Sequence, residues 1–340
     1  MGLLKRFKNI IMLLVVAALF ISTMQGSTAF AGEIVKGTYN INISDLNITG
    51  NAIQSLAFVE NSQKLIGSEV YLTVRSTSTT YVVRCSVSGM NITGQDYIEL
   101  KEFGHGESLE IIKENGKTYL WLGSSAYAGD TSKYWSTKIS CVEYIPNGTT
   151  KAGFNIVSTY AVDQNGKITL DSANGYKINT GTPTYWRVSI AFSTASICVR
   201  IANSDESKYI YFNNIDGGLT NAKIDSTLRT STPYISKVDK KTDRVSSNGV
   251  WSYQSHDIYN GFIYVAGGGE DGVAKINKLK ASTGALDTTL PTIDISNVYG
   301  GKQLEMEGIK VNQSYIFYML KPYGTTDLHK NTKIYYIDLK

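Results

Sequence analysis

A short motif recurs five times along the chain, and this repeat constrains the fold more than any other feature of the sequence. It occupies residues 54–58 (QSLAF), 107–111 (ESLEI), 188–192 (VSIAF), 254–258 (QSHDI) and 305–309 (EMEGI). The fifth position is apolar in every copy, and the first is Gln or Glu in four of them. Recurrence of one segment is typical of repeat architectures, in which each copy belongs to one structural unit.

Two further β-prone segments follow each copy of the motif. The nearer ones are residues 70–74, 118–122, 196–200, 262–265 and 315–319, and the farther ones are 81–87, 138–145, 209–212, 273–279 and 333–339. They are rich in Val, Ile, Tyr and Thr, which favour strands. The copies start about 50 to 80 residues apart, near the length of a four-stranded propeller blade with loop insertions. We therefore predict an all-β fold, a five-bladed β-propeller.

The two ends of the repeat indicate how the ring closes. One more β-prone segment, residues 37–43, precedes the first motif, and the last unit ends on a strand. We expect this N-terminal strand to complete the last blade, because closure removes the exposed strand edge of an open array. The alternatives are a two-sheet sandwich, a β-helix or a two-domain arrangement.

The N-terminus has the form of a secretory signal peptide. Lys5, Arg6 and Lys8 precede an apolar run over residues 10–21, and residues 29–31 (AFA) form a small-x-small cleavage site. The run is shorter than the roughly 20 residues that a membrane span requires. We expect residues 1–31 to be removed, residues 32–340 to form the propeller domain, and the protein to be secreted, with no stable membrane span.

Charge and cysteine content exclude some functions and leave others open. The formal net charge is +4, and three of the basic residues lie in residues 1–31, so the exported part is nearly neutral. This balance does not favour a nucleic-acid partner. Cys85, Cys141 and Cys198 each lie in a strand-like apolar run. Free buried thiols, or one disulfide with one thiol left over, are the alternatives for an odd number.

No catalytic template is recognisable in the sequence. It contains neither the GxSxG elbow of the α/β-hydrolases nor the HExxH and CxxC patterns of zinc sites. We predict no cofactor, no metal and no catalytic residue, and a non-enzymatic protein is favoured. The repeat does place carboxylates on its motif strands, and glycosidase chemistry uses two such groups, so an enzyme stays an alternative.

Polar residues of the motif and aromatic residues near it are the candidate binding site. Inner strands of a propeller line its central channel, and aromatic rings can stack on sugars. The candidates at the channel mouth and in loops are Gln54, His105, Glu107, Glu110, Trp135, Trp186, Gln254, His256, Asp257, Glu305 and Glu307. Val188 stands where a Gln or Glu is expected, which weakens the idea of an intact polar ring.

At the motif the chain resembles the helveticin J family of large bacteriocins. It is also similar to the wider propeller family that includes teichoic-acid biosynthesis protein C and phage receptor-binding proteins. Residues 105–111 (HGESLEI) resemble that family's H-x-[QE]-[ST]-x-E-[FI] segment, and residues 305–309 (EMEGI) its E-x-E-[SG]-I segment. Residues 54–58, with the strand that follows them, resemble the first blade.

The resemblance implies a secreted antibacterial protein that binds a cell-wall polymer of Gram-positive bacteria, such as teichoic acid, or another surface glycan. An immunity protein is a further partner to be sought. Two alternatives stand beside this interpretation. One is a secreted propeller that acts as a glycan hydrolase or lyase, and the other is a surface adhesion or targeting module without killing activity.

Overall fold

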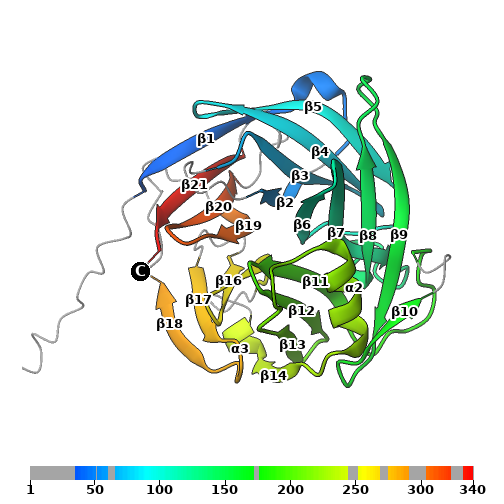
Figure 1. The fold of residues 1–340 in the computed structure, drawn as a ribbon, viewed down its shortest axis with the longest axis vertical. Coiled ribbons are helices and arrows are strands. Elements are labelled where there is room, and N and C mark those ends of the chain that lie inside the picture. The colour runs from blue at the N-terminus through cyan, green and yellow to red at the C-terminus, as the bar shows by residue number, and fades with distance from the viewer. Residues whose placement is uncertain are drawn as a thin grey trace, which may run out of the picture. The chain divides into compact units, whose positions relative to one another are not determined.

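The computed structural model in Figure 1 is built almost entirely of strands. The structure describes residues 35–50, 52–59, 66–171, 176–243, 252–268, 275–290, 304–322 and 332–339. The helices in this part are short: η1 (Ser44–Leu46), α2 (Asn221–Thr230) and α3 (Lys240–Asp243). The all-β prediction is therefore confirmed, whereas the predicted signal peptide lies outside the described residues. None of the described helices is long and apolar enough to cross a membrane.

Each copy of the repeated motif overlaps the first strand of an antiparallel run. The first run is β2 (Ala52–Phe58), β3 (Glu69–Ser76), β4 (Thr79–Ser88) and β5 (Asn91–Leu100). The second is β6 (Leu109–Glu114), β7 (Lys117–Ala126), β8 (Ser136–Ile145) and β9 (Gly153–Val162), to which β10 (Ile168–Asp171) adds an outer strand. The third is β11 (Trp186–Ser193), β12 (Ser196–Ala202), β13 (Glu206–Phe212) and β14 (Tyr234–Asp239).

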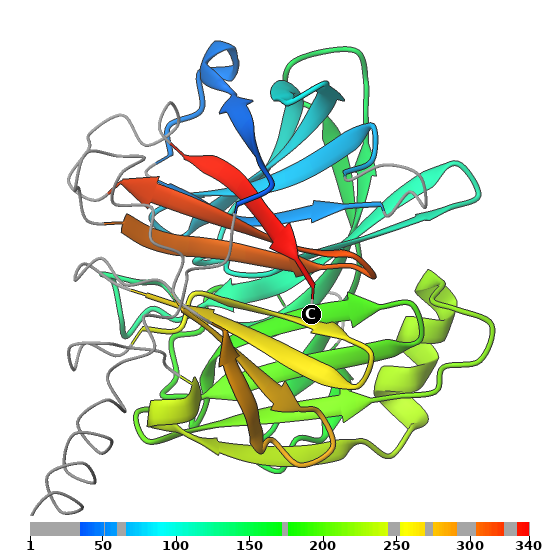
Figure 2. The ribbon, with the colours of Figure 1, turned by 90° about the vertical axis from the view of Figure 1, so that its left-hand side faces the viewer.

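The fourth and fifth runs repeat this order. The fourth is β15 (Ser255–Tyr259), β16 (Phe262–Gly267), β17 (Lys275–Lys280) and β18 (Leu286–Leu290). The fifth begins with β19 (Leu304–Val311), β20 (Tyr315–Pro322) and β21 (Lys333–Asp338). Figure 2 shows these last three strands side by side in orange and red. Asp239, the last residue of β14, accepts from the backbone N–H of Thr242 in α3, which follows directly.

The N-terminal strand β1 (Gly37–Asn42) closes the fifth run, as its place in the sequence predicts. It pairs antiparallel with β21, so the first described strand lies beside the last one (Figure 1). A second pairing was not predicted: Asn40–Asn42 also run parallel to β5. This contact joins the fifth and first runs into one sheet of eight strands.

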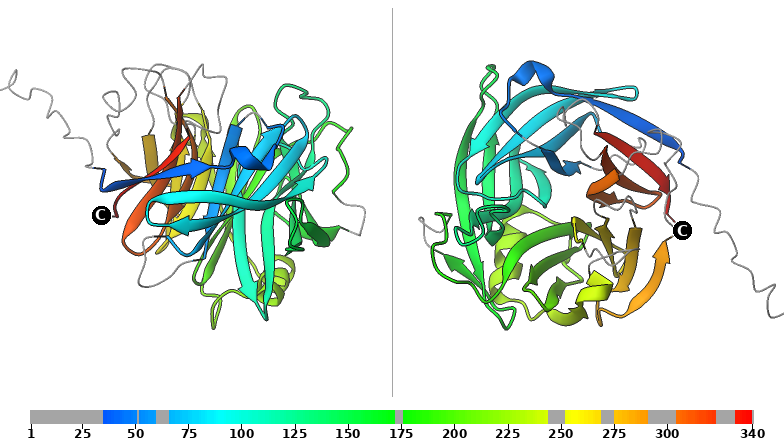
Figure 3. Two further views of the ribbon diagram at one scale, coloured as in Figure 1. Left: turned by 90° about the horizontal axis from the view of Figure 1, so that it is seen from above. Right: turned by 180° about the vertical axis from the view of Figure 1, so that it is seen from behind.

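The first strands contact one another in cyclic order, from β2 to β6, β11, β15, β19 and back to β2. The right-hand view of Figure 3 shows the runs around this centre from behind. The hydrophobic side chains of the described residues are divided among clusters between neighbouring runs. Leu56 and Phe317, for example, belong to the cluster between the first and fifth runs. This propeller-like arrangement places the apolar cores between the sheets and leaves the centre to polar side chains.

The three cysteines lie in different sheets, on β4, β8 and β12. Cys85, Cys141 and Cys198 are all buried and free. Burial raises the pKa of each thiol far above its usual value, so the reactive thiolate form is suppressed. Of the alternatives that the sequence leaves open, the structure therefore agrees with free thiols.

Candidate functional site

Polar side chains gather where the first strands begin, and we call this group the upstream cluster. It consists of Gln54, Arg75, His105, Glu107, Trp135, Arg187, Gln254, Glu305, Glu307 and Lys321. Two amides of the cluster bridge neighbouring runs: Gln54 Nε2 donates to Glu307 at 3.1 Å, and Gln254 Nε2 donates to Glu305 at 2.7 Å. The repeated Gln or Glu at the first motif position thus brings these strands together at the centre.

Lys321, on β20, is shared by two carboxylates of the upstream cluster. Its Nζ lies 2.8 Å from Glu305 and 2.5 Å from Glu307. Burial raises the pKa of Glu307 to about 8, Lys321 opposes this rise, and the charge of Glu305 adds to it. One cation cannot offset both the burial of Glu307 and the charge of the second glutamate beside it, so Glu307 keeps its proton near neutral pH. The cluster therefore holds a protonated carboxyl group close to a second carboxyl group, that of Glu305.

Glu107 and Arg187 form the second charged unit of the cluster. Arg187 Nε lies 2.9 and 2.8 Å from the two oxygens of Glu107, and its Nη2 also donates to Glu107 and to the Tyr253 carbonyl. The guanidinium stacks 3.9 Å above the ring centre of Trp135. Burial raises the pKa of Glu107, whereas the charge of Arg187 lowers it. The indole and the carboxylate together fix the position of the Arg187 head group.

A β-bulge explains why Arg187 was missed in the sequence. The pairing of β11 with β12 shifts between Trp186 and Ser189, and Arg187 has a left-handed backbone with φ of 58°. Val188, the motif residue that departs from Gln or Glu, is buried among apolar side chains instead. Arg187 thus supplies the polar group that Val188 lacks, one residue earlier than the motif predicts. Such backbone conformations are costly for non-glycine residues and are frequent at functional sites.

His105, another member of the upstream cluster, lies on a turn that is held by hydrogen bonds on both sides. Gly104 and Gly106 on either side of it have φ of 106° and 82°, and their carbonyls accept hydrogen bonds from Thr80 at 2.9 Å and Thr73 at 2.6 Å. His105 Nδ1 lies 2.7 Å from the Lys133 carbonyl. Burial lowers the pKa of His105 well below its usual value of 6.5, so the ring is neutral at physiological pH. Its ring centre is 4.3 Å from that of Trp135.

A second polar group, the downstream cluster, lies towards the other end of the first strands. It consists of Glu110, Asp257 and Lys310, with Lys310 Nζ against Glu110 and 3.4 Å from Asp257. Asp257 also accepts from the Val311 backbone N–H at 2.6 Å. Burial raises the pKa of Glu110 to about 8, with Lys310 opposing this and Asp257 adding to it. The three side chains line a pocket of about 300 Å³ together with Phe58, Phe192 and Leu219.

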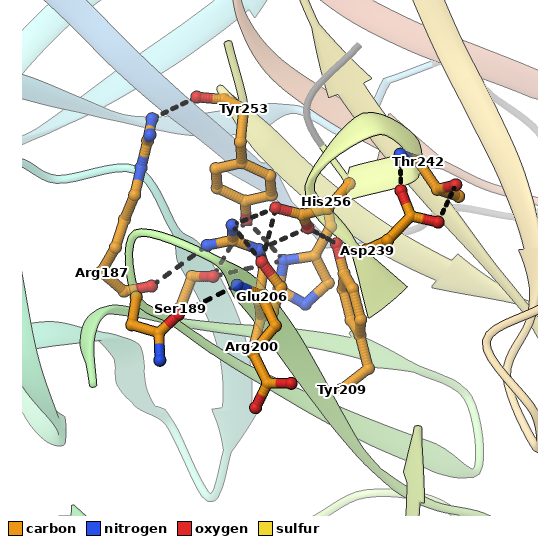
Figure 4. A network of polar contacts seen from close by, with 12 residues as sticks. Arg187, Ser189, Arg200, Glu206, Tyr209, Asp239, Thr242, Tyr253 and His256 are labelled. Carbon is orange, nitrogen blue, oxygen red and sulfur yellow. Dashed lines mark hydrogen bonds and ion pairs between the residues drawn. The ribbon is translucent and has the colours of Figure 1, made fainter. Parts of the chain in front are cut away.

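Two of the predicted site residues lie outside both clusters. His256 is buried between the third and fourth runs, where its Nδ1 is 2.8 Å from Tyr253 Oη and 3.3 Å from Ser189 Oγ (Figure 4). Burial lowers its pKa to about 3, so it does not serve as a base open to a ligand. Trp186 points towards Tyr127, with ring centres 6.4 Å apart. Among the described residues, neither side chain forms a hydrogen bond or an ion pair with the clusters.

A buried ion pair between Arg200 and Asp243 lies next to the upstream cluster. Arg200 on β12 donates to both oxygens of Asp243 at 2.9 and 2.6 Å, and both side chains are completely buried. Asp243 also accepts from Ser207 and Tyr209, each at 2.6 Å. The Arg200 guanidinium lies 3.5 Å above the ring centre of Tyr253 (Figure 4). This network positions Tyr253, whose carbonyl accepts from Arg187.

Sequence reasoning identified the carboxylates and amides of the site but not its cations. Arg75, Arg187, Lys310 and Lys321 come from second strands, from a bulge and from the residue after the last motif. The available signal was a basic residue inside an otherwise apolar strand, as in residues 315–321 (YIFYMLK). A buried cation of this kind needs a carboxylate partner, and the motif carboxylates are the candidates. Among the described residues, no three His, Cys, Asp or Glu side chains are grouped so that they could hold a metal ion.

Comparisons with known proteins show similarity to solved structures only. No family model matches the chain, and no curated protein matches it. An exo-β-1,3-galactanase from Phanerochaete chrysosporium, solved with β-1,3-galactotriose, is 12% identical with a TM-score of 0.48. The match covers 91% of this chain and 65% of the galactanase, so this chain spans about two thirds of that protein's length.

Two further structures give weaker similarities. A GH43_1 enzyme from Xanthomonas citri is 12% identical with a TM-score of 0.37, and the match covers 89% of this chain and 91% of that one. The Dos1 propeller is 8% identical with a TM-score of 0.37, covering 84% of this chain and 68% of that one. At such identities the similarity concerns the fold alone.

Proposed function

We propose that this protein is a carbohydrate-active β-propeller that binds a glycan at the upstream cluster and hydrolyses a glycosidic bond there. The observation that carries the proposal is the pair of glutamates around Lys321. Glu307 is protonated near neutral pH, and Lys321 contacts both Glu307 and Glu305. Glycosidases use a pair of carboxyl groups close together, one of which donates a proton.

The two glutamates would have different roles in the reaction. Glu307 donates its proton to the glycosidic oxygen as the bond between that oxygen and the anomeric carbon breaks. Because both glutamates contact Lys321 Nζ, they lie too close together for a water between them, so Glu305 bonds to the anomeric carbon instead. A water then gives a proton to Glu307 and displaces Glu305 from that carbon, which releases the sugar. The side chain of Glu305 is 21% exposed, the most of the three upstream glutamates, so the glycan approaches from its side. Lys321 keeps both groups in place throughout.

Release of reducing sugar ends tests this function directly. The purified protein is incubated with a panel of plant, fungal and bacterial glycans, and both bound glycan and new reducing ends are measured. E307Q should reduce release about 100-fold or more and leave binding largely intact, because Gln keeps the shape of the side chain but cannot donate the proton. E99Q is the matched control, since Glu99 lies in an exposed ion pair with Lys151 on β5. Release that persists unchanged in E307Q would refute the mechanism.

Glycan binding without cleavage is the second candidate function. The observation in its favour is that each upstream glutamate already has a cation of the protein as its partner, either Arg187 or Lys321. A bacteriocin, an adhesin and a targeting module would all bind a glycan at the cluster without cleaving it. The panel experiment separates the candidates: binding without new reducing ends supports this one, and a viable count on Gram-positive cells then distinguishes killing from adhesion.

We further propose that the protein is exported and that its domain is a five-bladed ring related to the helveticin J group. Export is supported by the basic, apolar and small-x-small order of residues 1–31. The ring is supported by the runs that begin at β2, β6, β11, β15 and β19, with β1 as the closing strand. The family relation rests on residues 105–111 and 305–309. Amino-terminal sequencing of the protein from the medium tests export, with Gly32 as the expected first residue.

A further inference from the structure

Arg75, at the end of β3, is the cation of the upstream cluster that lacks a carboxylate partner. Its Nη2 donates to the Ser132 carbonyl at 2.6 Å. Its Nε is buried and has no hydrogen-bond partner in the described part of the chain, where no carboxylate lies within 4.0 Å of its guanidinium either. Arg75 as a whole is only partly buried. A guanidinium of this kind has donors to offer to a ligand.

Arg75 nevertheless lies close to the proposed catalytic groups. Its pKa is lowered by burial, and the charges of Glu107, Glu307 and Glu305 raise it again, which places all three within electrostatic reach. Arg75 in turn lowers the pKa of His105. The guanidinium is therefore part of the upstream cluster, although it forms no ion pair there.

The other two cations of the cluster each have a carboxylate partner. Arg187 pairs with Glu107, and Lys321 pairs with Glu305 and Glu307. Arg75 has no such partner among the described residues. A partly buried guanidinium without a carboxylate partner, beside a ligand site, favours an anionic ligand.

We propose that the glycan bound at the upstream cluster is anionic, and that Arg75 binds its carboxylate or phosphate group. The inference rests on the proposed function and specifies its substrate class. A carboxylate would come from a uronic acid and a phosphate from a polyol phosphate chain; both accept two parallel hydrogen bonds from a guanidinium. Arg75 is a binding residue in this account, because it contacts the ligand's charge rather than the bond that breaks.

Equilibrium binding by calorimetry tests the proposal with three probes. These are an oligogalacturonate, an oligomer of glycerol phosphate and a neutral xylo-oligosaccharide of similar length. At least one anionic probe should bind about tenfold tighter than the neutral one, as a charge-assisted hydrogen bond implies. The preference should weaken as salt is raised. The anionic probe that binds more tightly identifies the source of the charge.

Substitution of Arg75 completes the test. R75Q should reduce the preference for the anionic probe about tenfold, and R75K should retain part of it. R229Q is the matched control, because Arg229 on α2 is an exposed arginine paired only with Asp225 among the described residues. Thermal unfolding shows whether R75Q is folded, and R75K provides a second variant if it is not.

The outcomes distinguish this inference from the proposed function. Equal binding of anionic and neutral probes, or a preference that R75Q leaves unchanged, overturns the role of Arg75 while glycan binding stands. Binding of none of the probes, together with no binding in the glycan panel, overturns both. A preference that R75Q removes and R229Q retains supports the inference.

Discussion

Arg187 meets Glu107 side-on across two neighbouring runs, with its Nε 2.9 and 2.8 Å from the two carboxylate oxygens. The pair is almost completely buried, with side-chain exposures of 13% and 6%. Its two residues are far apart in the sequence, on β11 and just before β6. The pair therefore links the second and third runs at the centre of the domain.

Removal of the arginine alone should destabilise the protein strongly. R187M leaves Glu107 buried without a cation, and we expect the free energy of unfolding to fall by about 3–5 kcal/mol. The double variant E107Q/R187M should recover part of this loss, because no charge is then left unpaired. Urea denaturation measures both. E99Q, which breaks an exposed pair, should cost less than about 1 kcal/mol, and an R187M protein as stable as E99Q would contradict the prediction.

Activity should fall on the alkaline side as Glu307 loses its proton. The pKa of this carboxyl is raised to about 8, and a proton donor works only in its protonated form. The rate of glycan cleavage should therefore decline as the pH rises through about 8. We expect E307Q to lower kcat about 100-fold or more and to abolish this alkaline limb. A pH–rate profile measures it, and a limb that survives in E307Q would assign the titration to another group.

Stability should also decrease with rising pH, because of the downstream cluster. Glu110 has a pKa of about 8 in the folded protein against 4.5 for its usual value, so the folded state holds more protons between these limits. The contribution of Glu110 to stability is therefore fully present at low pH, and it is lost as the pH rises through about 8.

The free energy of unfolding from urea titrations at pH 6 and pH 9 measures this effect. We expect a decrease on the order of 1–4 kcal/mol between the two, and a smaller decrease in E110Q. Glu307 contributes in the same direction, so E110Q/E307Q should flatten the dependence further. An increase in stability towards pH 9 in the unaltered protein would contradict the prediction.

Interruption of the closing strand should weaken the whole domain. The Asn40 N–H donates to the Met90 carbonyl at 2.9 Å, between β1 and β5. N40P removes this donor in a strand that is paired on both sides, and we expect a loss of about 3 kcal/mol. N40A keeps the donor, and the Asn40 side chain is exposed, so this variant is the control. Thermal unfolding of the two proteins provides the comparison; equal melting temperatures would show that the pairing with β5 adds nothing.

The strands could be predicted because their signal is local. Each motif, with the apolar segments after it, shows the alternation and the β-branched residues that fix a strand wherever it lies. The closing role of β1 could also be predicted from the sequence, because the last unit of the repeat lacks a fourth strand and residues 37–43 can supply it. The pairing of β1 with β5 could not be predicted, since nothing in residues 37–43 specifies a parallel partner.

Only part of the candidate site could be predicted, because its motif residues have a local signal whereas their partners do not. Gln54, Glu107 and Glu307 carry a repeated pattern, and the structure brings them together. The partners of these residues depend on register: Lys321 pairs with Glu305 across β20 and β19. Arg187 reaches the centre only because of a bulge in β11. His256 has the right position in its motif, yet it is turned into the packing between two runs, so position in a motif does not decide which way a side chain points.

The pairing of β1 with β21 also sets the order in which the domain can be completed. Ribosomes make β1 first and β21 last, so the earliest strand has to wait for its partner until nearly all of the domain has been synthesised. Contacts between residues so distant in sequence form slowly, because a long loop must close before they are made. A chain that ended before Lys333 would lack β21, so β1 would have no partner in the fifth run.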